Sequence, residues 1–373
     1  MLSKEEQEAY SRQLLLNEVG LEGQKKMKKA KVLVIGAGGL GCPVLQYLNA
    51  AGVGTLGIID SDKVEKSNLH RQLLFDYSCV GKGKAEAAKA QLKKNNLFTI
   101  INSYSQKVNP NNSIKILRNY DIIVDCTDNY TARYIINDAC VLLAKPLVYG
   151  AVYKFEGQVA LFNHMEGATY RCLFPEFTNT DAAENCNESG VLGVLPGIIG
   201  LMQANEVLKL ILNAGKLLSN SVLTYNGLTC TMSTLRIKRK EHKIYKRIKE
   251  QGRLNPSDYQ RNFCGLMTGV HEISFAEFDI IVNQEVQLID VREEEELPKL
   301  PELKALNIPA GQITTRIGEI NRSGKTIVFC RSGIRSNKVI KLLQDDHGFT
   351  NLSSLHGGVE SYIEQRDALL TSK

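Results

Sequence analysis

Short apolar runs alternate with stretches of helical spacing along the first part of this chain. Runs such as Val32–Ile35 and Thr55–Asp60 are almost continuously apolar, and between them apolar residues recur every three or four positions. This alternation predicts an α/β fold with a doubly wound, mostly parallel sheet. The predicted strands are Val32–Ile35, Thr55–Asp60, Thr99–Ser103, Asp121–Asp125 and Pro146–Val148, and the predicted helices are 40–51, 82–94 and 130–143.

The pattern changes after Val148, because the later strands lack this regular alternation with helices. We therefore expect them to extend the sheet in antiparallel order, beside a long apolar helix at 197–212. A capping-box pattern at Ser3–Glu6 predicts a helix near the start of the chain. The first domain is predicted to cover residues 1–240. The later strands are predicted at Gln158–Phe162, Val222–Tyr225 and Cys230–Ile237.

A second α/β pattern begins near His271 and predicts a small domain at 271–373. About a hundred residues are enough for one independent core. The predicted strands are Val286–Asp290 and Thr326–Cys330, and the predicted helices lie near 334–345 and 358–370.

The formal net charge of +6 is concentrated between the two domains. Arg236–Arg253 carries nine Lys or Arg against two Glu, a local charge of +7. A basic run of this kind is typical of a solvated linker, and no platform of interleaved aromatic residues accompanies it. We therefore expect a basic linker at 241–270 and no nucleic-acid partner.

The composition indicates a cytoplasmic protein. No apolar stretch of the 373 residues reaches the ~18 that a membrane helix needs, so we expect no membrane partner. The nine cysteines are scattered and form no C-x-x-C pair, as is typical of reduced thiols.

Three glycines, Gly36, Gly38 and Gly41, stand in G-x-G-x-x-G spacing between the first strand and the first regular helix. An acid, Asp60, follows about twenty residues later. This is the Rossmann-like dinucleotide fingerprint, in which a tight turn brings phosphate to a helix N-terminus. An NAD-dependent oxidoreductase is therefore one hypothesis.

Cationic residues that follow this glycine turn favour ATP over NAD as the bound nucleotide. Transfer of a nucleotidyl group needs cationic side chains or metal ions that neutralise negative charge on the α-phosphate and on the departing pyrophosphate. Hydride transfer has no such need. Arg71 and Lys84 supply such charge, and Asp128 follows a strand at the sheet edge where ligands bind. A carboxylate there suits Mg²⁺ that bridges phosphates.

Together these segments resemble the MoeB/ThiF adenylyltransferases, relatives of the ubiquitin-activating enzymes, over about residues 1–240. The resemblance implies that Asp60 holds the ribose and that Asp128 binds Mg²⁺. It also implies a homodimer in which Arg12 reaches the triphosphate of the neighbouring subunit. The implied nucleotide-site residues are Gly36, Gly38, Gly39, Gly41, Asp60, Asp62, Ser67, Asn68, Leu69, His70, Arg71, Gln72, Lys84, Asp128 and Asn129.

The same resemblance assigns a conjugating thiol and a zinc site. Cys186 stands in a polar segment before the apolar helix and corresponds to the family's conjugating cysteine. The family usually holds zinc with two C-x-x-C pairs, but here the first is reduced to Thr169–Cys172 and the second is missing. Tetrahedral structural zinc needs four ligands, so we expect none.

In the second domain, Cys330 follows a predicted strand and precedes a helix. Such geometry aims backbone amides and the positive end of the helix at the sulfur, which favours a thiolate and then a persulfide. The segment resembles the active loop of a single rhodanese domain. A phosphatase loop is the alternative, but its C-x₅-R spacing is one residue longer than the C-x₄-R found here. The predicted loop residues are Arg331, Ser332, Gly333, Ile334 and Arg335.

The two resemblances together imply one reaction sequence. ATP and Mg²⁺ would adenylate the C-terminal glycine of a ubiquitin-like sulfur carrier ending in Gly-Gly, and a Cys330 persulfide would then form the thiocarboxylate. The sulfur donor would be a cysteine desulfurase or thiosulfate. Such fusions supply sulfur for molybdopterin, thiamine and thio-tRNA. Adenylation of tRNA or another carrier stays open as an alternative.

Overall fold

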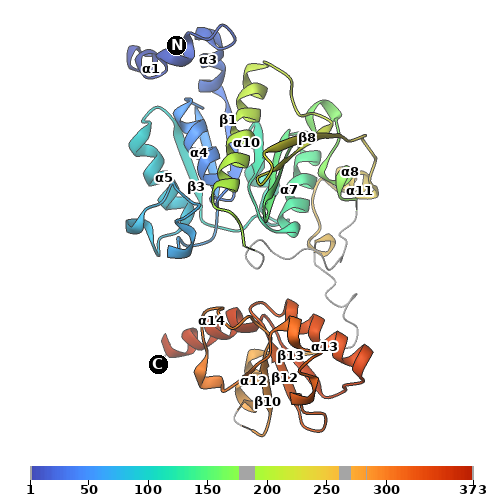
Figure 1. Cartoon of the computed structure of the whole chain (residues 1–373). Coiled ribbons are helices and arrows are strands. Elements are labelled where there is room, and N and C mark those ends of the chain that lie inside the picture. The colour runs from blue at the N-terminus through green and yellow to red at the C-terminus, as the bar shows by residue number, and fades with distance from the viewer. Residues whose placement is uncertain (1, 176–189, 260–269, 283, 372–373) are drawn as a thin grey trace. The chain divides into compact units, whose positions relative to one another are not determined.

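The computed structural model describes residues 2–175, 190–259, 270–282 and 284–371 (Figure 1). The chain forms two compact units, Met1–Gln260 and Arg261–Lys373, each built around its own sheet. The first sheet has eight strands in the order β3-β2-β1-β4-β5-β6-β7-β8, and the second has five in the order β11-β10-β12-β13-β9.

The first five strands of the first unit run parallel, as the sequence predicts. The order reverses beside β1, so the strand ends of β1 and β4 meet at the switch point where ligands bind in open α/β sheets. The strands are β1 Lys31–Ile35, β2 Thr55–Ile59, β3 Ile100–Tyr104, β4 Ile122–Asp125 and β5 Leu147–Tyr153.

The predicted antiparallel extension is also confirmed. Strand β6 pairs antiparallel with β5, and β7 and β8 continue the same order. Residues of β8 are exposed along its whole length, because this strand forms an edge of the sheet. The three strands are β6 Glu156–Phe162, β7 Ser221–Asn226 and β8 Thr231–Arg236.

Helices cover both faces of this sheet, and each face has its own apolar core. On one face lie α4 Gly41–Ala50, α5 Lys84–Asn95 and α10 Val194–Leu212. On the other lie α6 Ser113–Leu117, α7 Tyr130–Leu142, α8 Tyr170–Leu173 and α11 Lys243–Gln251. Among the described helices only α10 has the length and apolar composition of a membrane span, and it packs against α4, β5 and β6.

The N-terminal segment begins with the predicted capping box. The Glu6 backbone N–H donates to Ser3 Oγ at 3.1 Å, and Glu6 Oε2 accepts the Ser3 N–H at 2.7 Å. The expected single helix is broken at Tyr10, whose buried ring packs beneath Gly52. The segment holds α1 Lys4–Ala9, α2 Ser11–Leu14 and α3 Gly20–Lys29.

The predicted boundary at residue 240 is too early. Part of the expected linker at 241–270 folds as α11, which packs on α7 and buries Ile244, Tyr245 and Ile248. The charge of the basic run concealed this apolar stripe, since the lysines and arginines occupy the other positions of the helix.

The second unit is an all-parallel sheet with helices on both faces. Its strands are β9 His271–Ile273, β10 Gln287–Asp290, β11 Leu306–Asn307, β12 Thr326–Phe329 and β13 Leu352–Leu355, and its helices are α12 Phe275–Ile281, α13 Ile334–His347 and α14 Gly358–Thr371. Short 3₁₀ helices of the chain are η1 Lys66–Asn68, η2 Tyr77–Cys79, η3 His164–Glu166, η4 Pro256–Asp258, η6 Pro301–Leu303, η7 Ala310–Gln312 and η8 Ile317–Glu319.

The packing of α11 predicts where the first unit can be cut. A fragment of residues 1–260 should fold, whereas a fragment of residues 1–240 should be strongly destabilised. The shorter fragment loses the buried Ile244 and Ile248, each worth about 1.5–3 kcal/mol, and uncovers α7. Thermal unfolding of both fragments checks this; equal melting temperatures would contradict the role of α11.

Candidate functional site

The glycine corner Gly36–Gly41 joins β1 to the N-terminus of α4. Gly36 has φ +96°, and a Cβ there would lie 2.7 Å from the carbonyl oxygen of Cys126. A Cβ on Gly41 would lie 1.9 Å from the carbonyl oxygen of Gly36. These two glycines are therefore required by the close approach of β1, β4 and α4.

The middle glycines of the corner face a more open space. A Cβ on Gly38 would meet only Gln72 Nε2, at 3.8 Å, and one on Gly39 would lie 3.0 Å from Pro196. No side chain caps α4. An anionic ligand can therefore approach the backbone at Gly38 and the start of the helix.

Asp60 directly follows β2 and is held against this corner. Its Oδ2 accepts the Ala37 N–H at 2.8 Å, and its Oδ1 accepts the Asp62 N–H at 2.8 Å. Burial raises the pKa of Asp60, while the charge of Lys84 and the hydrogen bonds from the two backbone amides act to lower this pKa. Each oxygen keeps a lone pair, so the carboxylate can still accept hydroxyl groups of a ribose.

Two cations lie beside the corner. Lys84 is the first residue of α5, and its buried side chain places Nζ 3.1 Å from Asp62 Oδ2. Arg71 lies against Gly39, since a Cβ on that glycine would be 3.6 Å from Arg71 Cδ. The structure thus brings the predicted acids, cations and glycines to one edge of the sheet.

The residues next to Arg71 build the segment that carries it. Asn68 is buried at the end of η1, and Gln72 is buried against Gly38. The carbonyl of Ser67 lies 2.9 Å from His70 Nδ1 and accepts from Arg71 Nη1 at 3.2 Å. Leu69 packs on the apolar core beside α4, so its visible role is packing.

The acids after β4 have different surroundings. Asp125 is fully buried, which raises its pKa, and its Oδ1 accepts from the backbone and hydroxyl of Thr127. Asp128 is exposed at the rim of a cavity. Asn129 caps α7 by accepting the Ala132 N–H at 2.8 Å, so its visible role is structural.

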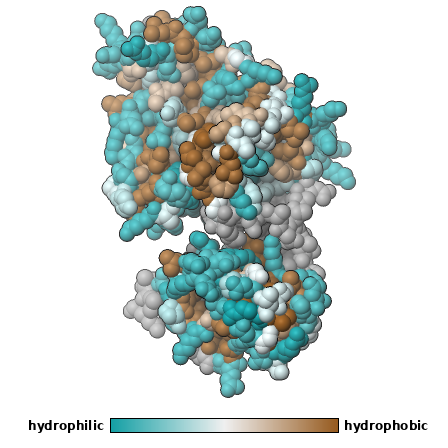
Figure 2. Space-filling model, in the orientation of Figure 1, coloured by the Kyte–Doolittle hydropathy of each residue, from teal (hydrophilic) through white to brown (hydrophobic). Residues whose placement is uncertain are grey.

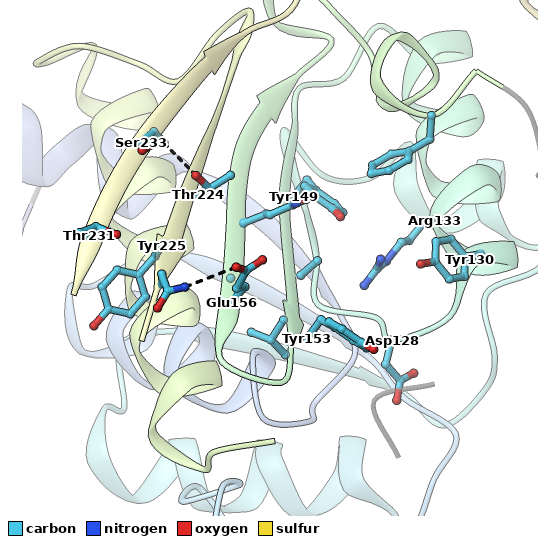
Figure 3. A pocket seen from close by; sticks show the side chains of 16 residues that line it. Asp128, Tyr130, Arg133, Tyr149, Tyr153, Glu156, Thr224, Tyr225, Thr231 and Ser233 are labelled. Carbon is cyan, nitrogen blue, oxygen red and sulfur yellow. Dashed lines mark hydrogen bonds between the residues drawn. The ribbon is translucent and has the colours of Figure 1, made fainter. Parts of the chain in front are cut away.

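A cavity of about 440 Å³ opens between the start of α7 and the antiparallel strands (Figure 3). Asp128, Tyr130 and Arg133 line one side, and Tyr149 and Glu156 come from β5 and β6. The other lining residues are Ala151, Val152, Tyr153, Gly157, Gln158, Phe174, Thr224, Tyr225, Asn226, Thr231 and Ser233. Extended strands and aromatic rings therefore form the walls of this cavity.

Arg133 is a site residue that the sequence analysis missed. It is only 7% exposed, donates from Nη2 to the Thr127 carbonyl at 2.9 Å, and lies over the rings of Tyr130 and Tyr149. Its Nε is buried without a hydrogen-bond partner in the described residues. The available signal was an arginine in register with Ile136 on the apolar stripe of a predicted helix.

In the second unit, Cys330 lies between β12 and the N-terminus of α13, as predicted. Its Sγ accepts the Gly333 N–H at 3.2 Å and the Ser336 hydroxyl at 3.7 Å. Gly333 has φ +89° and Ile334 begins the helix, so the turn directs the Gly333 amide at the sulfur. These donors stabilise negative charge on the sulfur.

Ion pairs fix both arginines of the Cys330 loop, which also contains the half-buried Ser332. Arg331 Nε donates to Glu360 at 2.7 Å, and Arg335 forms a bidentate pair with Glu296 at 2.5 and 2.8 Å. Hydrogen bonding to Arg335 lowers the pKa of Glu296. Cys330 is fully buried in this arrangement, so sulfur exchange requires the loop to move.

For two predicted site residues, the structure, over the residues that it describes, shows no contact with the glycine corner or with the Cys330 loop. Cys186 lies outside the described residues. Arg12 is exposed on α2, and no hydrogen bond or ion pair within the described part of the chain ties it to another residue.

Two family profiles match the chain. The ThiF family profile covers residues 10–246, and the rhodanese-like domain profile covers residues 277–365.

Curated relatives match nearly the full length. The adenylyltransferase and sulfurtransferase MOCS3 of Xenopus laevis is 36% identical over 394 residues, which cover 96% of this chain and 87% of the relative. The Arabidopsis thaliana protein of the same name is 38% identical, covering 97% and 84%. A sulfur carrier protein adenylyltransferase of Thermus thermophilus is 47% identical over 242 residues, covering 64% of this chain and 89% of the relative.

Solved structures share the fold of the first unit. E. coli MccB in complex with MccA-N7isoASN has a TM-score of 0.55 and 23% identity, covering 64% of this chain and 73% of that one. PaaA has a TM-score of 0.56 and 24% identity, covering 64% and 76%.

The glycine corner predicts opposite outcomes for two alanine substitutions. Gly41→Ala should lower the melting temperature sharply, because its Cβ collides with a backbone carbonyl. Gly38→Ala should keep the melting temperature but weaken ATP binding, since its Cβ enters open space where phosphate approaches. Calorimetry with ATP and thermal unfolding distinguish the two; normal ATP affinity in Gly38→Ala would exclude the corner as the phosphate site.

Proposed function

The chain belongs to the ThiF family and carries a rhodanese-like domain, and from this we propose that it activates and then thiolates a ubiquitin-like sulfur carrier protein. The observation that carries the proposal is one chain with two distinct anion sites. The first unit has a cationic phosphate corner beside a peptide-sized cavity. The second has a cysteine whose sulfur accepts hydrogen bonds from the Gly333 amide and the Ser336 hydroxyl.

In the first step, the carboxylate of the carrier's C-terminal glycine attacks the α-phosphorus of ATP. The bond to the β-phosphate oxygen breaks, and pyrophosphate leaves with its electron pair. Asp60 holds the ribose, while the N-terminus of α4, Arg71 and Lys84 offset charge on the phosphates. Asp128 would hold Mg²⁺, which would supply further positive charge beside the phosphates, and a single carboxylate plus phosphate oxygens suits that ion.

The cavity is the proposed path of the carrier's tail. An extended Gly-Gly tail is narrow enough to lie between the antiparallel strands and the start of α7 and to bring its carboxylate past Asp128. The Arg133 side chain lines this path, and its guanidinium can donate to the tail. We assign this residue to binding of the carrier.

In the second step, a persulfide on Cys330 attacks the carbonyl of the acyl adenylate, and AMP leaves. The product is an acyl disulfide between carrier and enzyme. An external thiol then attacks the Cys330 sulfur and releases the carrier thiocarboxylate, leaving a mixed disulfide that a second thiol reduces. We propose that Cys186, as the conjugating thiol, holds the carrier as a covalent intermediate. A cysteine desulfurase or thiosulfate would recharge Cys330 with sulfane sulfur.

We also propose that the working form is a cytoplasmic homodimer. Exposed apolar side chains gather on α10, where Val194 and Leu201 are 59% and 38% exposed, and Figure 2 shows an apolar area over this helix. Leu15 and Leu16 beside Arg12 are also exposed. Burial of these surfaces in a dimer would fit the role of Arg12 toward a neighbouring triphosphate. All seven cysteines in the described residues are free thiols, which suits a reducing compartment.

Asp128→Ala should abolish carrier-dependent ATP:pyrophosphate exchange, because it removes the proposed Mg²⁺ ligand at the cavity rim. Glu156→Ala, which removes another exposed carboxylate lining the same cavity, serves as the matched control and should keep measurable exchange. Retained exchange in Asp128→Ala would refute its assigned role.

Cys330→Ala should stop sulfur transfer from thiosulfate to cyanide while carrier adenylation continues. The exposed thiol of Cys230 gives the control, and Cys230→Ala should change neither activity. Loss of adenylation in Cys330→Ala would show that the two units do not carry separate activities.

A further inference from the structure

A buried cluster of polar side chains joins α7, α8 and the segment after β8. The Thr169 hydroxyl lies 2.7 Å from the Tyr245 hydroxyl, to which Asn137 Nδ2 donates at 3.1 Å. Asn137 Oδ1 accepts the Tyr170 N–H at 2.9 Å. Three segments that are distant in sequence are therefore tied together by hydrogen bonds.

Asp138 forms the charged centre of the same cluster. It is fully buried and accepts from Arg171 Nε and Nη2 at 2.8 and 2.7 Å. Asn137 and Tyr259 each donate a further hydrogen bond, at 2.9 and 2.8 Å. Four donors satisfy both carboxylate oxygens, so the buried charge is fully compensated.

Cys172 occupies the point where zinc would be expected. Its Sγ accepts the N–H groups of Thr169 at 3.3 Å and of Lys240 at 3.2 Å. It therefore bridges the remnant of the first C-x-x-C pair and the segment that should carry the second.

The side chains present do not fit a structural zinc ion. Such a site needs four Cys or His ligands. Cys172 supplies one, the Thr169 hydroxyl is taken up by Tyr245, and Lys240 contributes only backbone. In the described ranges, no three His, Cys, Asp or Glu side chains converge in a way that could hold a metal ion.

The cluster also supports one wall of the cavity. The Arg171 guanidinium lies 4.5 Å from the ring centroid of Tyr134, whose hydroxyl donates to the Phe174 carbonyl at 3.1 Å. Phe174 lines the cavity, and α7 carries Arg133 on the same wall. Movement of α8 against α7 would therefore displace the cavity wall.

We propose that a polar clasp takes the place of the zinc that the family resemblance implies, and that this clasp positions the cavity wall. The clasp is made of Asn137, Asp138, Thr169, Arg171, Cys172, Tyr245 and Tyr259. Its residues are positioning residues, since none touches the phosphate corner. The effect on carrier binding rests on the proposed function. The claim that the clasp holds α7, α8 and α11 together without zinc does not.

Metal analysis of the purified full-length protein tests whether the clasp stabilises the fold without zinc. We expect less than stoichiometric zinc, and we expect excess chelator to leave the melting temperature unchanged. One zinc per chain, or a drop in melting temperature with chelator, would overturn the proposal.

Tyr245→Phe tests the positioning role by removing one hydroxyl. We expect the melting temperature to fall by about 2–4 °C and the KM for carrier to rise several-fold, with the KM for ATP unchanged. Zinc should not restore either. Tyr120→Phe is the matched control, because its equally buried hydroxyl bonds Asn102 and Tyr104 away from the clasp; its carrier KM should not change.

An unchanged carrier KM in Tyr245→Phe would refute positioning of the cavity wall. If the wild-type protein shows no carrier-dependent exchange, the proposed function fails instead. In that case the metal content and the melting temperatures of the wild type and Tyr245→Phe still test whether the clasp stabilises the fold without zinc.

Discussion

The close contact of β1, β4 and α4 is the constraint on which the first unit depends. Backbone atoms occupy the places where Cβ atoms of Gly36 and Gly41 would stand. This contact points the start of α4 at the open side of the corner and sets Asp60 against Ala37. The strands that converge there also deliver Arg71 and Asp128 to the same edge. Because Gly36 and Gly41 lack a Cβ atom, the acids, the cations and the helix N-terminus can come together at one site.

The second unit uses the same physical device for different chemistry. In both units a parallel strand leads through a glycine-containing turn into a helix whose N-terminus can stabilise negative charge. At Gly38 the space is open and suits phosphate, whereas at Cys330 the sulfur itself fills the cradle. An enzyme that must make an acyl adenylate and then attack it with a sulfur anion has reason to use both. This pairing explains why the two domains occur in one chain.

Local patterns in the sequence predicted the fold well where they agreed with packing. Parallel strands, the antiparallel extension and the Cys330 loop follow from apolar runs, turns and motif spacing. The failure at 241–260 has a physical cause, because a short amphipathic stripe is hidden by a high density of Lys and Arg. Short edge strands such as β11 were missed because two residues carry too little pattern.

The sequence could indicate candidate site residues where a motif carries them, and not where tertiary packing brings them together. Arg133 and the polar clasp depend on rings and carboxylates that come together only in the folded chain. Conversely, Asn129 and Leu69 belong to the motif but have visible structural roles. The most direct measurement is mass spectrometry of a Gly-Gly carrier after incubation with the protein, ATP, Mg²⁺ and a sulfane sulfur donor. The account predicts the mass change of one carboxyl oxygen replaced by sulfur, dependent on Cys330; an unmodified carrier in the complete mixture would contradict it.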